Sequence, residues 1–135
     1  MDKQTFLGLL EASGIQVRQA LDRFMGNEDL YLSFLAKLPG QLHFEEILRA
    51  LGEEDEDAFY MGVHNLKGLA GNLGLTPIHD CAQAILVEFR ASRFQHRNKL
   101  TALTWEAKRE SEHVAALIEG YFGEGARARY GTHCW

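Results

Sequence analysis

Hydrophobic residues recur along most of the chain at the spacing of an amphipathic helix, and the alternation typical of a strand is nearly absent. Residues 27–51 contain two such helical runs, separated by Pro39 and Gly40. The second run is out of phase with the first by about one residue, and an internal proline removes a helical hydrogen bond. We therefore predict a long helix that begins at the N-cap Asn27 and is kinked or split at Pro39-Gly40. Its inward positions are predicted to be Tyr31, Phe34, Leu35, Leu38, Leu42, Phe44, Ile47, Leu48 and Leu51.

The next helix is predicted between two glycines, with Gly52 as the C-terminal stop of the preceding helix and Gly74 as its own end. Acidic side chains fill residues 53–57, and carboxylates stabilise the positive N-terminal end of a helix dipole. Apolar residues then recur every three or four positions, as in a helix packed within a bundle. These residues are Phe59, Val63, Leu66, Ala70 and Leu73.

Two further helices are predicted after Gly74. Thr76 and Pro77 form a start signal, in which a capping hydroxyl precedes a proline at the first helical position. The inward positions of this helix are predicted to be Ile78, Cys81, Ile85 and Phe89. A heptad-like run of about twenty residues then predicts the last long helix. Its inward positions are predicted to be Leu100, Leu103, Ala107, Val114, Leu117 and Tyr121.

Four long amphipathic helices with short connections predict an all-α fold, an antiparallel up-down four-helix bundle. Shorter apolar patterns at residues 5–12 and 17–26 predict one or two short N-terminal helices that cap one end of the bundle. We predict a single domain over residues 1–122 and a mobile C-terminal tail over residues 123–135, where no apolar period remains. A closed bundle of this kind is expected to be a monomer.

Composition and charge narrow the classes of function. The chain has 135 residues and a formal net charge of -5, which argues against a nucleic-acid partner because such binding depends on clustered Lys and Arg. No membrane association and a cytoplasmic location are expected, since the sequence has neither a long apolar run nor a leader-like segment. Cys81 and Cys134 lack the spacing of a disulfide framework or a zinc site, and Cys81 is expected to be a buried small hydrophobe.

The segment HNLKGLAGNLG, residues 64–74, places glycines in a predicted helix, where each lowers stability by up to about 1 kcal/mol relative to alanine. Helical geometry puts His64 beside the inward stripe, so it is expected to be partly exposed. Lys67 and Gly68 follow His64 by three and four residues and therefore share its face. The neighbouring positions on this face are Tyr60, Met61 and Gly71.

These residue types suit a histidine that carries a phosphoryl group. Imidazole is a nucleophile that is largely neutral near pH 7. A phosphorylated His64 would be strongly anionic, and the ammonium group of Lys67 is placed to stabilise that charge. Glycines on this face would let a partner's active site approach without collision, although Gly71 is equally consistent with close helix packing.

The motif resembles the signature of histidine-containing phosphotransfer (HPt) domains, which is His-x-x-Lys-Gly followed by a small residue, a glycine and a second glycine at the helix end. The segment GIQVRQALDRFMGNEDLYLSFL and the acidic residues before the motif are also similar to bacterial members. The similarity covers roughly residues 14–122. It implies that His64 is the phosphoacceptor, through Nε2, in a multistep two-component phosphorelay.

The resemblance also implies the partners, which are the receiver domains of a response regulator and of a hybrid sensor histidine kinase. The receiver would supply an acidic pocket and Mg²⁺, so this chain would need no cofactor of its own and would catalyse nothing alone. Lys67 matches the family lysine, and Gly68 matches the glycine that makes room for the receiver. Several members carry a glutamine on the next helix; that position falls on Leu86 here, and Gln83, one turn earlier, is expected to substitute for it.

The alternative function is a helical-bundle adaptor that binds receiver domains without accepting a phosphoryl group. A di-metal bundle needs Glu-x-x-His pairs on facing helices, and only Glu110 with His113 has that spacing, so no metal site is predicted. A kinase is not expected, because the sequence has no glycine-rich nucleotide loop. The remaining histidines are expected to be ordinary structural or solvated residues; they are His43, His79, His96, His113 and His133.

Overall fold

The computed structural model describes the backbone of residues 1–129 and the side chains of residues 1–123. All regular structure within residues 1–129 is helical, as predicted. The elements are α1 (Lys3–Ala12), α2 (Val17–Arg23), α3 (Glu28–Lys37), the 3-10 turn η1 (Leu38–Gln41), α4 (Phe44–Glu53), α5 (Glu56–Asn72), α6 (Thr76–Ser92) and α7 (Arg97–Arg129).

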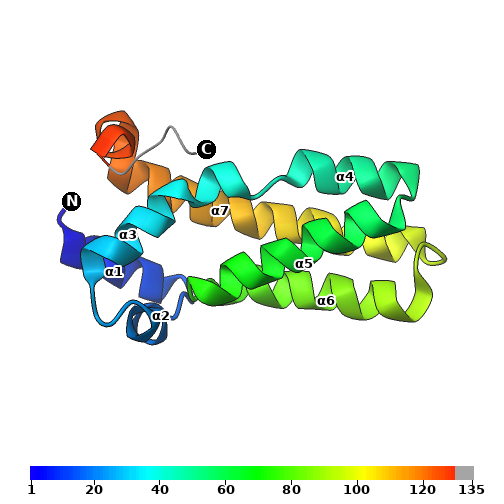
Figure 1. Ribbon diagram of the computed structural model, residues 1–135, viewed down its shortest axis with the longest axis horizontal. Helices are drawn as coiled ribbons and strands as arrows, with labels where there is room; N and C mark the ends of the chain where they lie inside the picture. Colours follow the sequence, from blue (N-terminus) through cyan, green and yellow to red (C-terminus); the bar gives the residue numbers. More distant parts are fainter. Residues whose placement is uncertain (130–135) are drawn as a thin grey trace.

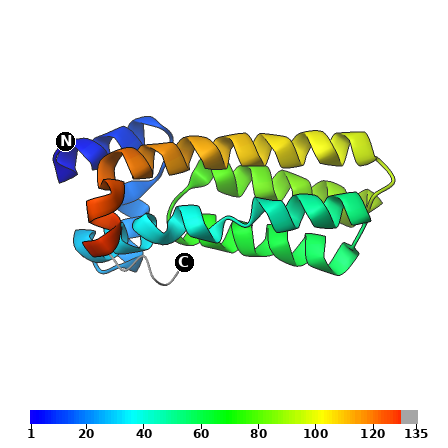
Figure 2. The ribbon, with the colours of Figure 1, turned by 90° about the horizontal axis from the view of Figure 1, so that it is seen from above.

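The long helices form an antiparallel up-down bundle with four rods (Figure 1). The first rod is α3, η1 and α4 taken together, and the others are α5, α6 and α7 (Figure 2). Helix α5 packs against α4 and α6, and α7 packs against α6 and α3. The short helices α1 and α2 cover the end of the bundle where α5 finishes (Figure 1). The predicted fold class is therefore confirmed.

The first rod is split where the sequence predicted, because Pro39 lies in η1 and His43 adopts a left-handed conformation with φ of 56°. Because of this break, the second apolar run also faces the core, and Phe44, Ile47 and Leu51 are buried. The inward position predicted for Phe34 is wrong, since its side chain is 42% exposed. Its ring packs on the flank of the bundle instead, with its centroid 5.3 Å from that of Phe24, because Tyr31 and Leu35 already fill the core stripe.

Two helix ends differ from the sequence prediction. Gly52 lies inside α4, and the chain reverses two residues later at Glu54, which has a φ of 52°. Asp55 then caps α5 by accepting a hydrogen bond from the backbone N–H of Ala58 at 3.1 Å. The capping hydroxyl predicted for Thr76 is also wrong, because Leu75 is the N-cap of α6 and Thr76 is already helical.

Cys81 is half-buried and packs against the core from α6. It is therefore less buried than the sequence predicted. Burial raises the pKa of its thiol to about 11, so the thiol is protonated near neutral pH.

The end of α5 is tied to the N-terminal helices by backbone and side-chain hydrogen bonds. Gly74 has a φ of +73°, and its carbonyl oxygen accepts a hydrogen bond from the backbone N–H of Gln16 at 2.8 Å. The buried hydroxyl of Tyr31 donates to the carbonyl oxygen of Leu73 at 2.8 Å. Gly74 thus ends the helix as predicted, and these bonds fix the position of α5 relative to α2 and α3.

Helix α7 passes through a break at Gly123, which has φ of 60° and ψ of -171°, and continues to Arg129 in a new direction (Figure 2). A helix therefore occupies part of the segment that the sequence assigned to a tail over residues 123–135. The expectation for residues 130–135 lies outside the described residues. None of the helices within residues 1–129 is long and apolar enough to cross a membrane.

Candidate functional site

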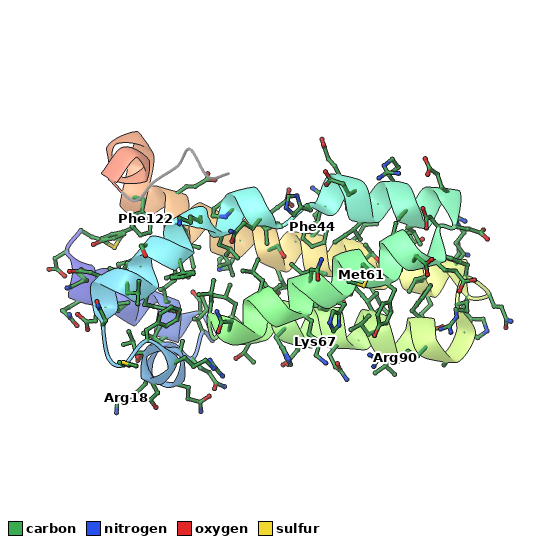
Figure 3. All side chains as sticks on the ribbon, in the orientation of Figure 1. Arg18, Phe44, Met61, Lys67, Arg90 and Phe122 are labelled. Atoms are coloured by element: carbon green, nitrogen blue, oxygen red, sulfur yellow. The ribbon has the colours of Figure 1, made fainter. Side chains whose placement is uncertain are left out.

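Helix α5 carries His64 on its outer side, between positions that face the core. Val63 and Leu66 are fully buried, whereas the His64 side chain is exposed and Lys67 is half-buried. Figure 3 shows Lys67 on α5 and Arg90 on the neighbouring helix α6. The helical period therefore places an imidazole and an ammonium group together at the surface.

The glycines of α5 have different surroundings. A Cβ atom added at Gly68 would meet nothing within 4 Å, so this position is open to solvent. A Cβ atom added at Gly71 would lie 3.4 Å from Cδ2 of His79, which is close to normal van der Waals contact. At Gly62, by contrast, an added Cβ atom would lie 2.8 Å from Cγ1 of Ile47 on α4, which is too close. The open surface next to His64 is thus made by Gly68, while Gly71 borders α6.

An open depression of about 440 Å³ lies beside His64. We call it the His64 depression; it is lined by Arg23, His64, Lys67, Gly68, Gly71, Asn72 and His79. A second hollow next to it shares Arg23, Gly71 and His79 and extends to Gln16, the N-cap of α2, and to Gln19 within that helix. Three helices therefore contribute to the surface around His64, although the sequence motif lies on α5 alone.

Arg23, Asn72 and His79 are the lining residues that the sequence did not mark as part of the site. The guanidinium group of Arg23 donates to the carbonyl oxygen of Asn72 at 3.4 Å, which holds it over the end of α5. His79 lies opposite Gly71 because α5 and α6 run antiparallel. Its Nδ1 atom is 3.3 Å from a carboxylate oxygen of Asp80. An antiparallel count from Gly74 could have found His79, but no sequence signal pairs Arg23 with α5.

On the other side of His64, an aromatic contact links it to Tyr60. The two ring centroids are 5.7 Å apart and the ring planes differ by 10°. Nη2 of Arg90 donates to the Tyr60 hydroxyl at 3.1 Å, and the guanidinium carbon lies 5.7 Å from the centre of the Tyr60 ring. Met61 is 49% exposed and lines a separate hollow together with Tyr60 and Arg90. Tyr60 thus contacts His64, whereas Met61 does not line the His64 depression.

The structure does not bring Gln83 into the His64 depression. Gln83 is half-buried, its Oε1 atom is buried, and no hydrogen-bond partner for that atom exists among the described residues. Leu86, where a family-like glutamine was expected, is fully buried in the core. Among the described residues no hydrogen bond or ion pair reaches the His64 imidazole, and its ring contact is with Tyr60. Within the same residues, no three His, Cys, Asp or Glu side chains are grouped so that they could hold a metal ion.

The structure is an antiparallel helical bundle that carries an exposed histidine and a half-buried lysine side by side on one helix, so its candidate reactive groups lie at the surface. A family model described as Hpt domain matches residues 29–121, more than half of the chain. The chain therefore belongs to the Hpt domain family and has a phosphotransfer role in two-component signalling, which confirms the resemblance seen in the sequence. No curated protein and no solved structure matched the chain. The family match begins in the first turn of α3 and leaves α1 and α2 outside it.

Proposed function

We propose that His64 is the phosphoacceptor and carries a phosphoryl group between the aspartates of receiver domains in a multistep phosphorelay. The observation that supports this most strongly is the exposed imidazole of His64 beside Lys67 and the open position of Gly68, in a chain of the Hpt domain family. The partners would be the receiver domain of a response regulator and that of a hybrid sensor histidine kinase.

The transfer step requires an imidazole nitrogen with a free lone pair. Nε2 of neutral His64 attacks the phosphorus of the receiver's aspartyl phosphate, the bond from phosphorus to the carboxylate oxygen breaks, and the aspartate leaves as a carboxylate. The ring then releases its Nδ1 proton to water. The reverse step returns the phosphoryl group to an aspartate. In this proposal the receiver supplies Mg²⁺ and the acidic pocket, and this chain supplies the nucleophile and its surroundings.

Lys67 would stabilise the anionic phosphoryl group once it is bound to His64. Arg23 lies at the same depression, so its guanidinium group adds positive charge at the rim. The chain as a whole is acidic, with a formal net charge of -5. A local concentration of basic groups on an acidic protein favours an approaching phosphorylated partner at this place. Gly68 leaves room for the partner's active site.

Phosphotransfer from a set of phosphorylated receivers tests the role of His64. The wild-type protein should acquire an acid-labile, base-stable phosphoryl label, and His64→Gln should lose it entirely while its thermal melt stays unchanged. His79→Gln is the matched control, because it removes another histidine of the same depression and should keep the label. A wild-type protein that binds receivers and never takes up the label would instead be an adaptor.

The charge of Lys67 can be tested in the same assay. Lys67→Ala should slow transfer or shorten the lifetime of phosphohistidine by roughly tenfold, since one charge-assisted contact would be lost. Lys108→Ala is the control, because Lys108 lies on α7 and pairs with Glu112 at 2.8 Å. Equal effects of the two variants would remove the role assigned to Lys67.

A further inference from the structure

The His64 imidazole lies parallel to the ring of Tyr60, which precedes it by one helical turn. The ring centroids are 5.7 Å apart with an angle of 10° between the planes, which corresponds to an offset stack. Side chains at positions i and i+4 of a helix are neighbours, so the backbone alone brings the rings near each other. Their parallel orientation needs a further cause, because an exposed imidazole can otherwise rotate.

Tyr60 is itself held in place from α6. Its hydroxyl accepts a hydrogen bond from Nη2 of Arg90 at 3.1 Å, and the Arg90 guanidinium also lies near the face of the ring, 5.7 Å from its centre. Tyr60 is half-buried, while His64 is exposed. The tyrosine ring is thus fixed by contacts between two helices, and the imidazole rests against a fixed surface.

We propose that Tyr60 is a positioning residue for phosphotransfer, holding the plane of the His64 imidazole through this stack. The proposal rests on the proposed function of His64. Leu86 is buried and apolar, Gln83 does not line the His64 depression, and no described residue makes a hydrogen bond to the imidazole. The aromatic stack is therefore the contact that limits ring rotation, and it takes the place of a hydrogen bond to the ring.

If Tyr60 positions the imidazole, loss of the stack should change the rate of transfer and not the affinity for the receiver. An imidazole that rotates freely presents its nucleophilic nitrogen to the phosphorus for a smaller fraction of time, so the rate at saturating donor falls. The affinity for the receiver changes little, because the surface that the partner contacts stays nearly the same. The same loss appears with a small phosphoryl donor, which has no interface with Tyr60.

The test compares Tyr60→Leu with Tyr60→Phe. Each variant receives phosphoryl groups from a phosphorylated receiver and, separately, from phosphoramidate, whose P–N bond breaks and releases ammonia. We expect Tyr60→Leu to lower the saturating rate with both donors by roughly three- to tenfold, with KM for the receiver within about twofold of wild type. Tyr60→Phe keeps the ring and should restore most of the rate. Trp105→Leu, which removes an exposed ring on α7 outside the His64 depression, should leave the phosphoramidate rate unchanged.

A spectroscopic measurement separates ring placement from chemistry. The tyrosine ring current should shift the carbon-bound protons of the His64 imidazole in the NMR spectrum, and this shift should be lost in Tyr60→Leu and kept in Tyr60→Phe. An unchanged saturating rate in Tyr60→Leu, or an effect confined to the receiver's KM, would overturn the positioning role and make Tyr60 a partner contact. Such results would leave the function of His64 intact, which only the His64→Gln experiment decides.

Discussion

On α5, Gly62 and Gly68 lie less than two turns apart, yet a side chain would meet opposite surroundings at the two positions. A Cβ atom at Gly62 would lie 2.8 Å from Cγ1 of Ile47, whereas one at Gly68 would meet nothing within 4 Å. Packing against α4 therefore explains Gly62, and no contact within residues 1–123 explains Gly68. Gly62 thus allows close helix packing within the bundle, whereas Gly68 leaves space for a group from outside the molecule.

The largest effect on the free energy of unfolding is expected from a substitution of Gly74, at the end of α5. Gly74 has a φ of +73°, and a Cβ atom there would lie 2.6 Å from the carbonyl oxygen of Gln16. Gly74→Ala should therefore lower the free energy of unfolding by about 2–4 kcal/mol, from the strained backbone and the clash. Gly68→Ala should raise it by about 0.5–1 kcal/mol, because alanine favours a helix. Urea denaturation of both variants measures this difference, and a comparable loss of stability in Gly68→Ala would show that Gly68 is also constrained by packing.

A longer side chain at Gly68 should affect phosphotransfer without unfolding the protein. Gly68→Gln is expected to slow transfer from a receiver by at least roughly tenfold, because the glutamine fills the space beside His64. Gly8 offers a matched control, since it is an exposed glycine within α1 and a Cβ atom there would also meet nothing within 4 Å. Gly8→Gln should transfer like wild type in the same assay. Normal transfer by Gly68→Gln would mean that the partner docks elsewhere.

The smallest effect is expected from a charge at the rim of the His64 depression. Arg23→Ala should weaken receiver binding by about two- to fivefold at low salt and less at high salt, as for other exposed charges at an interface. Arg18→Ala is the control, because Arg18 is also on α2 but lies in a different hollow, beside Glu11 and Glu28. Titration of both variants with a receiver at two salt concentrations measures the effect. Equal affinities would remove α2 from the proposed interface.

Helical periodicity and proline were sufficient to predict most of the fold. The inward stripe of α5 was correct at Phe59, Val63, Leu66, Ala70 and Leu73, because each residue of a regular helix keeps a fixed angle to the next. The predictions failed where tertiary contacts decide the outcome. Phe34 has the right spacing for the core but packs on Phe24 instead. The helix end expected at Gly52 lies at Glu54 instead, which adopts a left-handed conformation.

Only the site residues that lie on α5 could be predicted from the sequence. The offsets of His64, Lys67 and Gly68 follow from the helical period, and the structure places all three around one depression. The positions of Arg23 and of the Arg90 contact with Tyr60 depend on how α2 and α6 lie against α5, which local spacing does not encode. Gln83 shows the opposite failure. The count from His64 placed the family glutamine position on Leu86, Gln83 one turn earlier was expected to substitute for it, and the packing leaves Gln83 outside the His64 depression.

The bonds that tie α5 to the N-terminal segment have a consequence for how the protein unfolds. Phe6, Leu10 and Ala20 are fully buried, and the ring of Phe6 stacks on that of Tyr121 with centroids 4.2 Å apart. The N-terminal helices therefore belong to the same cooperative unit as the bundle, although the family match begins at residue 29. The peptide N–H of Gln16, bonded to Gly74, should exchange with solvent as slowly as the core of α5. Detachment of α1 and α2 from the bundle and fraying of the C-terminal end of α5, the helix that carries His64, would then be a single event.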